Sequence, residues 1–303
     1  MKKLILFSIM SFWLTSLYGA YKGPVIDAHV HVSDPDGNTF QKDMKEANVT
    51  KAISMSFPGK EDMLSGRYDN IIELCEADFV DGFPRLATKH EGKKCAGYGE
   101  IGLRHYDKTK KRLPGKPQPT LVVSFEDVSV KEYFDISNKM QSPIVLHIEP
   151  FFDVEGIDNL YEVKGFYKDT CRKYPNLPII ASHTGMMSAS DFRELLVACS
   201  NLYADFKIMP GRNGQRGFRD LFIIHTKDVK FLHSDWESLF VDYPDRFLFG
   251  SDWKTYRMGR RHGRRLDYSD GIDMTRKLLS TLPDDVQEKV LYKNAKRIFQ
   301  IND

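Results

Sequence analysis

Two histidines, His29 and His31, are separated by one residue in the apolar segment that runs from Val25 to Val32. In an extended strand alternate side chains share a face, so both imidazoles can reach one ion while Val30 points the other way. A His-x-His pair alone is a weak signal, because two histidines can equally be ordinary core or surface residues. The pair gains meaning from the other histidines and carboxylates of the chain.

Further potential metal ligands lie at or near the ends of later strand-like runs. They are Glu100 within residues 97–103, His147 within 143–150, His183 within 179–185 and Asp252 within 247–253. Imidazoles and carboxylates without a thiolate suit zinc, and manganese, iron and nickel are weaker candidates. We therefore predict a site for one or two zinc ions formed by His29, His31, Glu100, His147, His183 and Asp252.

The elements that must position these residues are short apolar runs that alternate with longer amphipathic segments. Eight runs are predicted as strands, over residues 25–32, 52–57, 85–88, 97–103, 144–148, 179–182, 202–206 and 247–250. Near-continuous hydrophobic strands that alternate with helices are typical of parallel pairing. Eight of them predict a (β/α)8 TIM barrel, in which the carboxyl ends of all strands meet at one face. An open doubly wound sheet is the alternative, but no glycine-rich phosphate-binding turn follows any run.

Helices are predicted between the strands and at the end of the chain. They cover residues 68–80, 130–140, 160–174, 191–198, 236–243, 273–282 and 284–299. The polar stretches 104–118 and 207–230 are predicted as loops that follow strands. Since no linker, internal repeat or low-complexity block divides the chain, residues 21–303 are expected to form one domain.

The N-terminus has the layout of a secretory signal peptide. Lys2 and Lys3 precede an apolar run over residues 4–17, and the small residues Gly19 and Ala20 follow it. Such a run is too short for a comfortable membrane span. We expect residues 1–20 to be removed and the mature protein to be exported, either periplasmic or secreted. An uncleaved membrane anchor is the alternative.

The four cysteines are Cys75, Cys95, Cys171 and Cys199. An oxidising compartment permits disulfides, and four cysteines allow three pairings. The sequential pairing joins Cys75 to Cys95 and Cys171 to Cys199. Buried free thiols are the alternative.

The charge of the chain is balanced overall but basic in one loop. Without Lys2 and Lys3 the formal charge falls from +2 to 0, so no net field favours nucleic acid or an anionic membrane. Basic side chains gather after Asp252, at Lys254, Arg257, Arg260, Arg261, His262, Arg264 and Arg265. Such a run is usually a solvated face. Alternatively Arg257, together with Lys207 after the seventh predicted strand, recognises an anionic group of a small-molecule substrate.

Several motifs together resemble the amidohydrolase superfamily, in particular the metal-dependent hydrolases of amidohydrolase family 2. They lie in residues 26–31, 174–185, 243–252, 282–285 and 294–299, and at His147. The resemblance implies a TIM barrel with a metal held by His29, His31, His147 and Asp252, and with His183 as a ligand or a positioning group. It also implies that Asp252 accepts a proton from the attacking water and passes it to the leaving group.

Glu100 decides how many metals the site holds. Its segment Gly-Glu-Ile-Gly-Leu resembles the TatD-type deoxyribonucleases, in which a glutamate bridges two metals. Many family 2 members hold one metal, so both numbers stay open. Asp27 is expected to make a buried structural contact, and Glu149 to support His147 from behind. Lys89 and His90 are expected either in the pocket or in a solvated loop.

These features favour an exported metal-dependent hydrolase that acts on a carbonyl compound such as a lactone, an ester or an amide. Two enzyme alternatives share the site: a non-oxidative decarboxylase of the same family and a metal-dependent nuclease or phosphoesterase. A barrel that binds a metal or ligand without turnover is the non-enzymatic alternative. A homo-oligomer is compatible with the sequence.

Overall fold

Parallel strands alternate with helices along the chain, as in the (β/α)8 fold. The computed structural model describes residues 18–32, 37–55, 68–75, 96–106, 120–152, 157–208, 224, 230–255 and 267–302. The strands of the barrel are β1 (Val25–His31), β2 (Val49–Ser54), β3 (Ile71–Glu73), β4 (Tyr98–Tyr106), β6 (Ile144–Ile148), β9 (Ile179–Ala181), β10 (Leu202–Phe206) and β11 (Phe247–Phe249).

Two sheets contain these strands. One has the order β12-β1-β2-β3, where β12 is Trp253–Lys254, and the other has the order β11-β10-β9-β6-β4-β5, where β5 is Thr120–Val122. On one side the sheets meet at Cys75, whose backbone N–H donates to the Gly97 carbonyl at 2.9 Å. On the other side the Asp252 N–H donates to the His29 carbonyl at 2.8 Å. This second contact ties the end of β11 to the strand that carries the His-x-His pair.

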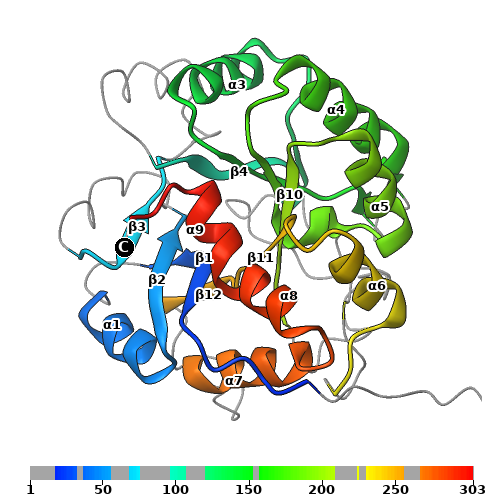
Figure 1. The fold of residues 1–303 in the computed structure, drawn as a ribbon. Helices are drawn as coiled ribbons and strands as arrows, with labels where there is room; N and C mark the ends of the chain where they lie inside the picture. Colours follow the sequence, from blue (N-terminus) through cyan, green and yellow to red (C-terminus); the bar gives the residue numbers. More distant parts are fainter. Residues whose placement is uncertain are drawn as a thin grey trace, which may run out of the picture.

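Helices lie around the outside of the strands (Figure 1). They are α1 (Gly37–Glu46), α3 (Val128–Met140), α4 (Leu160–Lys173), α5 (Ala189–Ala198), α6 (Ser234–Asp242) and α7 (Tyr268–Leu279). A short hairpin of β7 (Phe151–Phe152) and β8 (Ile157–Asp158) follows β6. The apolar sides of the helices and strands form a continuous core that includes Phe40, Tyr167 and Phe247.

The C-terminal helical segment closes one end of the barrel. It consists of α8 (Asp284–Glu288), a π-helical turn over residues 289–293, and α9 (Asn294–Ile298). Figure 1 shows α9 lying across the strands. Its apolar residues form a cluster with residues from several strands: Ile26, Ala28, Ile53, Val145, Ile180, Leu248, Ala295, Ile298 and Phe299. In β1, β6 and the segment around β11 the cluster residues precede His29, His147 and Asp252, so along these strands the apolar core comes first and polar side chains follow at the carboxyl ends.

One predicted helix is wrong. Residues 68–80 were expected to be helical, but Ile71–Glu73 forms β3 and pairs in parallel with β2, with Ile71 opposite Ala52. A short apolar run cannot be assigned to a helix or a strand from periodicity alone, and its two isoleucines favour a strand. The strand predicted over residues 85–88 lies outside the described residues.

Other boundaries differ less. The predicted loop 104–118 begins inside β4, because residues 104–106 pair antiparallel with β5. Helix α7 starts at Tyr268 rather than at residue 273, since Asp267 and Asp270 form a capping box that fixes its first turn. The predictions for β6 and β10 are confirmed over their full lengths.

Of the two alternatives for Cys171 and Cys199, buried free thiols are confirmed, and the disulfide between these two cysteines is wrong. The Cys199 thiol donates to the Tyr167 carbonyl at 3.7 Å. Cys75 is disulfide-bonded, and its predicted partner Cys95 lies outside the described residues.

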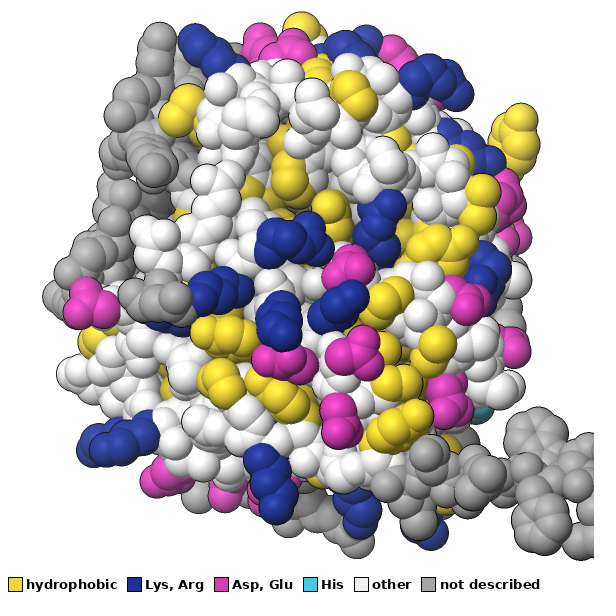
Figure 2. Space-filling view, viewed as in Figure 1, with side chains coloured by type: hydrophobic (Ala, Val, Ile, Leu, Met, Phe, Trp, Pro, Cys, Tyr) yellow, Lys and Arg dark blue, Asp and Glu magenta, His cyan; other side chains and the backbone are white. Residues whose placement is uncertain are grey.

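Figure 2 shows the face of the barrel that α8 and α9 cover, where basic and acidic side chains are intermixed. On this face Lys289 pairs with Asp245 at 3.1 Å, and Arg297 donates to the Asp245 carbonyl at 2.8 Å. Within the described ranges, no helix has both the length and the apolar character needed to cross a membrane.

Candidate metal centre

A register shift in β1 directs the His-x-His pair into the site. The pairing of β1 with β2 is irregular between Asp27 and Val30. Ile26 and Ala28 face the inside of the barrel in the apolar cluster, and His29 and His31 also face the inside, toward Glu100 and Asp252. Strict alternation would put these two pairs on opposite faces of the strand. The irregularity interrupts the alternation, as bulges near active sites do.

His29 is fully buried and oriented from behind by a carboxylate. Its Nδ1 lies 2.9 Å from Oδ2 of Asp205 in β10. Its Nε2 has no hydrogen-bond partner among the described residues and lies 3.7 Å from Glu100 and 3.8 Å from Asp252. A carboxylate on one ring nitrogen leaves the other nitrogen as the ligand atom, which is the usual arrangement of a metal-binding histidine.

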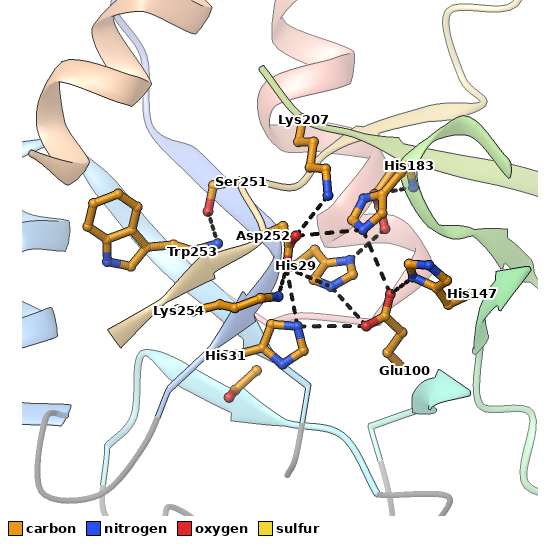
Figure 3. A network of polar contacts seen from close by, with 12 residues as sticks. His29, His31, Glu100, His147, His183, Lys207, Ser251, Asp252, Trp253 and Lys254 are labelled. Carbon is orange, nitrogen blue, oxygen red and sulfur yellow. Dashed lines mark hydrogen bonds and ion pairs between the residues drawn. The ribbon is translucent and has the colours of Figure 1, made fainter. Parts of the chain in front are cut away.

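Glu100 lies between two pairs of histidines (Figure 3). Its Oε2 is 3.7 Å from Nε2 of both His29 and His31. Its Oε1 is 2.5 Å from Nδ1 of His147 and 3.8 Å from Nε2 of His183. Each oxygen of one carboxylate thus faces a different pair of imidazoles.

His183 is fixed at the point where β9 ends. Its backbone is left-handed, with φ 55°, and its N–H donates to Oδ1 of Asp205 at 2.8 Å. Its Nδ1 lies 3.2 Å from the same oxygen, and its ring stacks on His29 with centroids 4.9 Å apart. Asp205 therefore orients two histidines of the site at once.

Sequence reasoning missed Asp205. The signal was available, because Asp205 is an acidic residue inside the otherwise apolar run Leu202–Phe206, and a buried carboxylate needs partners. Gly250 was also not singled out. A Cβ on Gly250 would lie 2.6 Å from the Cβ of His29 and 3.1 Å from that of Asp205, so only glycine fits between them.

Asp252 follows β11 and contacts both histidines and lysines. Its backbone is left-handed, with φ 52°, and its Oδ1 lies 3.3 Å from Nε2 of His31. Lys207 Nζ donates to Oδ2 at 2.8 Å, and Lys254 Nζ donates to Oδ1. The sequence placed both lysines near the site, but not on this carboxylate.

The supporting carboxylates are buried. Asp27 accepts hydrogen bonds from the Ser251 N–H at 2.9 Å and the Tyr268 hydroxyl at 2.8 Å, so it ties the loop before Asp252 to α7. Glu149 lies 3.3 Å from Nε2 of His147. Arg257 and the rest of the basic run after residue 255, as well as Lys89 and His90, lie outside the described residues.

The two central carboxylates are ionised. Burial opposes the charge of Glu100, but His147 and His29 hold its pKa well below the ordinary value. Burial also opposes the charge of Asp252, and Lys207 with His31 holds its pKa well below the ordinary value. Two negative groups therefore face the histidines at neutral pH, and carboxylates with histidines are a common ligand set of zinc.

The histidines fall into two classes. Burial lowers the pKa of His31 to about 4, and burial with the nearby Lys207 lowers that of His183 to about 4. Burial alone would lower the pKa of His29, but the carboxylates of Asp205 and Glu100 outweigh it and raise this pKa to about 10. In the same way, Glu100 outweighs burial and raises the pKa of His147 to about 9.

The residues fit a metal ion. His29, His31 and Asp252 form one group of ligand atoms that all lie within 4.8 Å of one another, and His29, Glu100 and His183 form a second. The nitrogen and oxygen donors and the buried, unpartnered Nε2 of His29 match the preferences of zinc. His147 adjoins the second group through Glu100.

The family model described as "Amidohydrolase" matches residues 77–301. The chain therefore belongs to the amidohydrolase family, a family of metal-dependent enzymes that act on small molecules, as the motifs had indicated. A search of curated proteins finds no match.

Solved structures show the same fold at low sequence identity. An uncharacterized TIM-barrel protein from Bordetella bronchiseptica is 11% identical with a TM-score of 0.62, over 91% of this chain and 98% of that one. A dihydroorotase from Campylobacter jejuni is 17% identical with a TM-score of 0.57, and the match covers 92% of this chain and 84% of the dihydroorotase. A 2,6-dihydroxybenzoate decarboxylase complexed with 2,6-dihydroxybenzoate is 12% identical with a TM-score of 0.53, over 92% and 100%.

Proposed function

We propose that this protein is an exported metal-dependent hydrolase that cleaves a lactone, an ester or an amide. The observation that carries the proposal is the Glu100 carboxylate between two histidine pairs, with the ionised Asp252 beside one of them. Membership of the amidohydrolase family supports it.

The geometry favours two zinc ions over one. His29, His31 and Asp252 would hold the first ion, together with Oε2 of Glu100. His147 and His183 would hold the second with Oε1 of Glu100. When bound, the metal supplies a nucleophilic water at neutral pH and polarises the carbonyl that the water attacks.

The protein groups would handle the proton. Asp252 is charged and borders both histidine pairs, since its two oxygens lie 3.3 Å from His31 and 3.8 Å from His183. It can accept the proton of the attacking water and deliver it to the leaving group. In a one-metal site, where it would not be a ligand, His183 would be neutral because its pKa is low, and it could orient the water or hydrogen-bond the developing oxyanion.

A substrate panel tests the reaction. Zinc-loaded protein is incubated with lactones, esters and N-acyl compounds, with phosphodiesters, and with 2,6-dihydroxybenzoate. Hydrolysis of a carbonyl compound that the Asp252→Asn variant no longer performs supports the proposal. Cleavage of phosphodiesters alone, or loss of carbon dioxide from the benzoate alone, would assign the site to one of the alternative reactions.

Metal analysis and fractionation test the remaining parts. Two zinc ions per chain are expected after loading, and one in the His147→Ala variant. A loaded wild-type protein with a single ion would reduce Glu100 to a supporting role. If the protein is exported, the product expressed from the full-length sequence should be found outside the cytoplasm. Its mature N-terminus should lie near residue 20.

A further inference from the structure

Two lysines approach the metal centre from different strands. Lys254 lies in β12 directly opposite His31 in the pairing of β12 with β1. Lys207 follows β10, two residues after Asp205. In Figure 3 both side chains point into the site, whereas Trp253 between Asp252 and Lys254 points away.

Each lysine holds a different oxygen of one carboxylate. Lys254 Nζ donates to Oδ1 of Asp252, and Lys207 Nζ donates to Oδ2 at 2.8 Å. Two ammonium groups, one on each oxygen, can bind a carboxylate. In this structure the bound carboxylate is that of Asp252. The two lysine side chains remain 18% and 15% exposed, so a small solute can reach them.

A metal ion needs the same oxygens. Oδ1 of Asp252 is the atom that lies 3.3 Å from Nε2 of His31 and 3.8 Å from Nε2 of His29. An ammonium and a divalent cation cannot both occupy this position, because like charges at such distances repel strongly. A bound metal ion would therefore displace Lys254 from Oδ1. It would also repel Lys207, whose Nζ binds the other oxygen of the same carboxylate.

We propose that Lys254 and Lys207, which contact the two oxygens of Asp252, form a carboxylate-binding pair that turns to a carboxylate of the substrate when Asp252 binds the metal. The inference rests on the proposed function in one respect, that Asp252 is a metal ligand. It narrows the substrate class to carbonyl compounds that carry a carboxylate near the scissile bond.

Zinc affinity is the first test. Chelator-treated protein is titrated with zinc in competition with a coloured chelator, for wild type, Lys254→Met, Lys207→Met and the surface control Lys289→Met. We expect Lys254→Met to bind zinc about 10-fold more tightly, Lys207→Met to show a smaller gain, and the control to match wild type. Unchanged or weaker zinc binding by Lys254→Met, or an equal gain in the control, would overturn the proposal.

Succinate binding is the second test, measured by calorimetry without turnover. Zinc-loaded wild type should bind succinate at least about 10-fold more tightly than the zinc-free protein does. It should bind the neutral diamide of succinate more weakly than succinate itself. Both lysine variants should lose about 10-fold in succinate affinity. Equal succinate binding by wild type and both variants would refute the pair.

The two tests separate this inference from the proposed function. If succinate binding depends on both lysines while the substrate panel shows no hydrolysis, the carboxylate-binding pair stands and the hydrolase proposal fails. Circular dichroism and the melting temperature show whether each variant folds. If a methionine variant does not fold, Lys254→Gln and Lys207→Gln remove the charge and keep a polar side chain.

Discussion

The two ends of the barrel are built from the same strands and have opposite chemistry. In β6, Val145 belongs to the apolar cluster under α9, and His147, two residues later, contacts Glu100 at the other end. In the chain around β11, Leu248 lies in the same cluster, and Asp252 follows the end of the strand. A few residues along each strand therefore separate a packed core from a candidate metal centre.

The difference teaches which end stabilises the protein. Burial of an apolar side chain contributes roughly 1.5–3 kcal/mol, so Ile298 and Phe299 stabilise the closed end. At the other end buried carboxylates and imidazoles cost free energy unless they are paired. The apolar end offsets the cost of the polar end.

Replacing Asp252 by Asn should have the largest effect. The amide cannot accept a proton, so turnover of the substrate found in the panel should fall about 10³-fold, within the range for a general base. The melting temperature of the metal-free protein should also fall, because the amide leaves the partly buried Lys207 and Lys254 without the negative charge that pairs with them. Steady-state kinetics and calorimetry measure both. Turnover within a few fold of wild type would remove Asp252 from its proton-accepting role.

Replacing Phe299 by Ala should break the other end. Phe299 is 5% exposed within the cluster under α9, and its truncation should lower the free energy of unfolding by about 3–5 kcal/mol. Urea unfolding measures the loss, and Val197→Ala, at a residue 73% exposed, is the surface control. Zinc stoichiometry of the folded fraction should stay at the wild-type value. A loss of zinc in proportion to stability would show that the two ends are not separable.

The pH dependence of stability should report the cost of the polar end. Burial raises the pKa of Asp27 from 3.8 to about 6, so the folded protein binds this proton more tightly than the unfolded chain. Below pH 3.8 Asp27 is protonated in both the folded and the unfolded state, so the free-energy cost of burying its charge is absent. Above pH 6 it is ionised in both states, and the cost is present in full. Stability from this group therefore falls as pH rises through that window, by up to about 3 kcal/mol.

The Asp27→Asn variant removes this dependence. The free energy of unfolding of the metal-free variant minus that of metal-free wild type should increase by up to about 3 kcal/mol as the pH rises from 4 to 6.5. Urea unfolding at several pH values gives the difference. A constant difference across the window would show that Asp27 does not titrate there.

Replacing Gly250 by Ala should have the smallest effect. The added Cβ would lie 2.6 Å from the Cβ of His29, closer than Cβ atoms approach in proteins, so β1 or the turn at Gly250 must shift and carry the ring and its supporting carboxylate with it. We expect zinc affinity to fall about 10- to 100-fold, as for other residues that orient a ligand. Gly271→Ala in α7 is the matched control, because nothing lies within 4 Å of its added Cβ. Equal zinc affinities in both variants would contradict the role of Gly250.

Much of the fold could be predicted from periodicity. The runs of β6 and β10 are five residues long, too short for a typical helix, and they alternate with longer amphipathic segments, so they are predicted as strands. The amphipathic α4 is predicted within one residue of its observed end. β3 could not be predicted, because three residues carry no measurable period. The two-residue β12 was missed for the same reason.

The ligand set could be predicted from residue types at strand ends, because the barrel brings all carboxyl ends to one face. The sequence alone therefore determined the residues from which a metal site could be built, His29, His31, Glu100, His147, His183 and Asp252. Only the tertiary structure decided how they face one another. It placed Glu100 between two histidine pairs, Asp205 behind two rings, and both lysines on Asp252. Apart from the contact of Lys254 with Asp252, two residues away, these contacts join residues far apart in the chain, and no local sequence pattern encodes such distances.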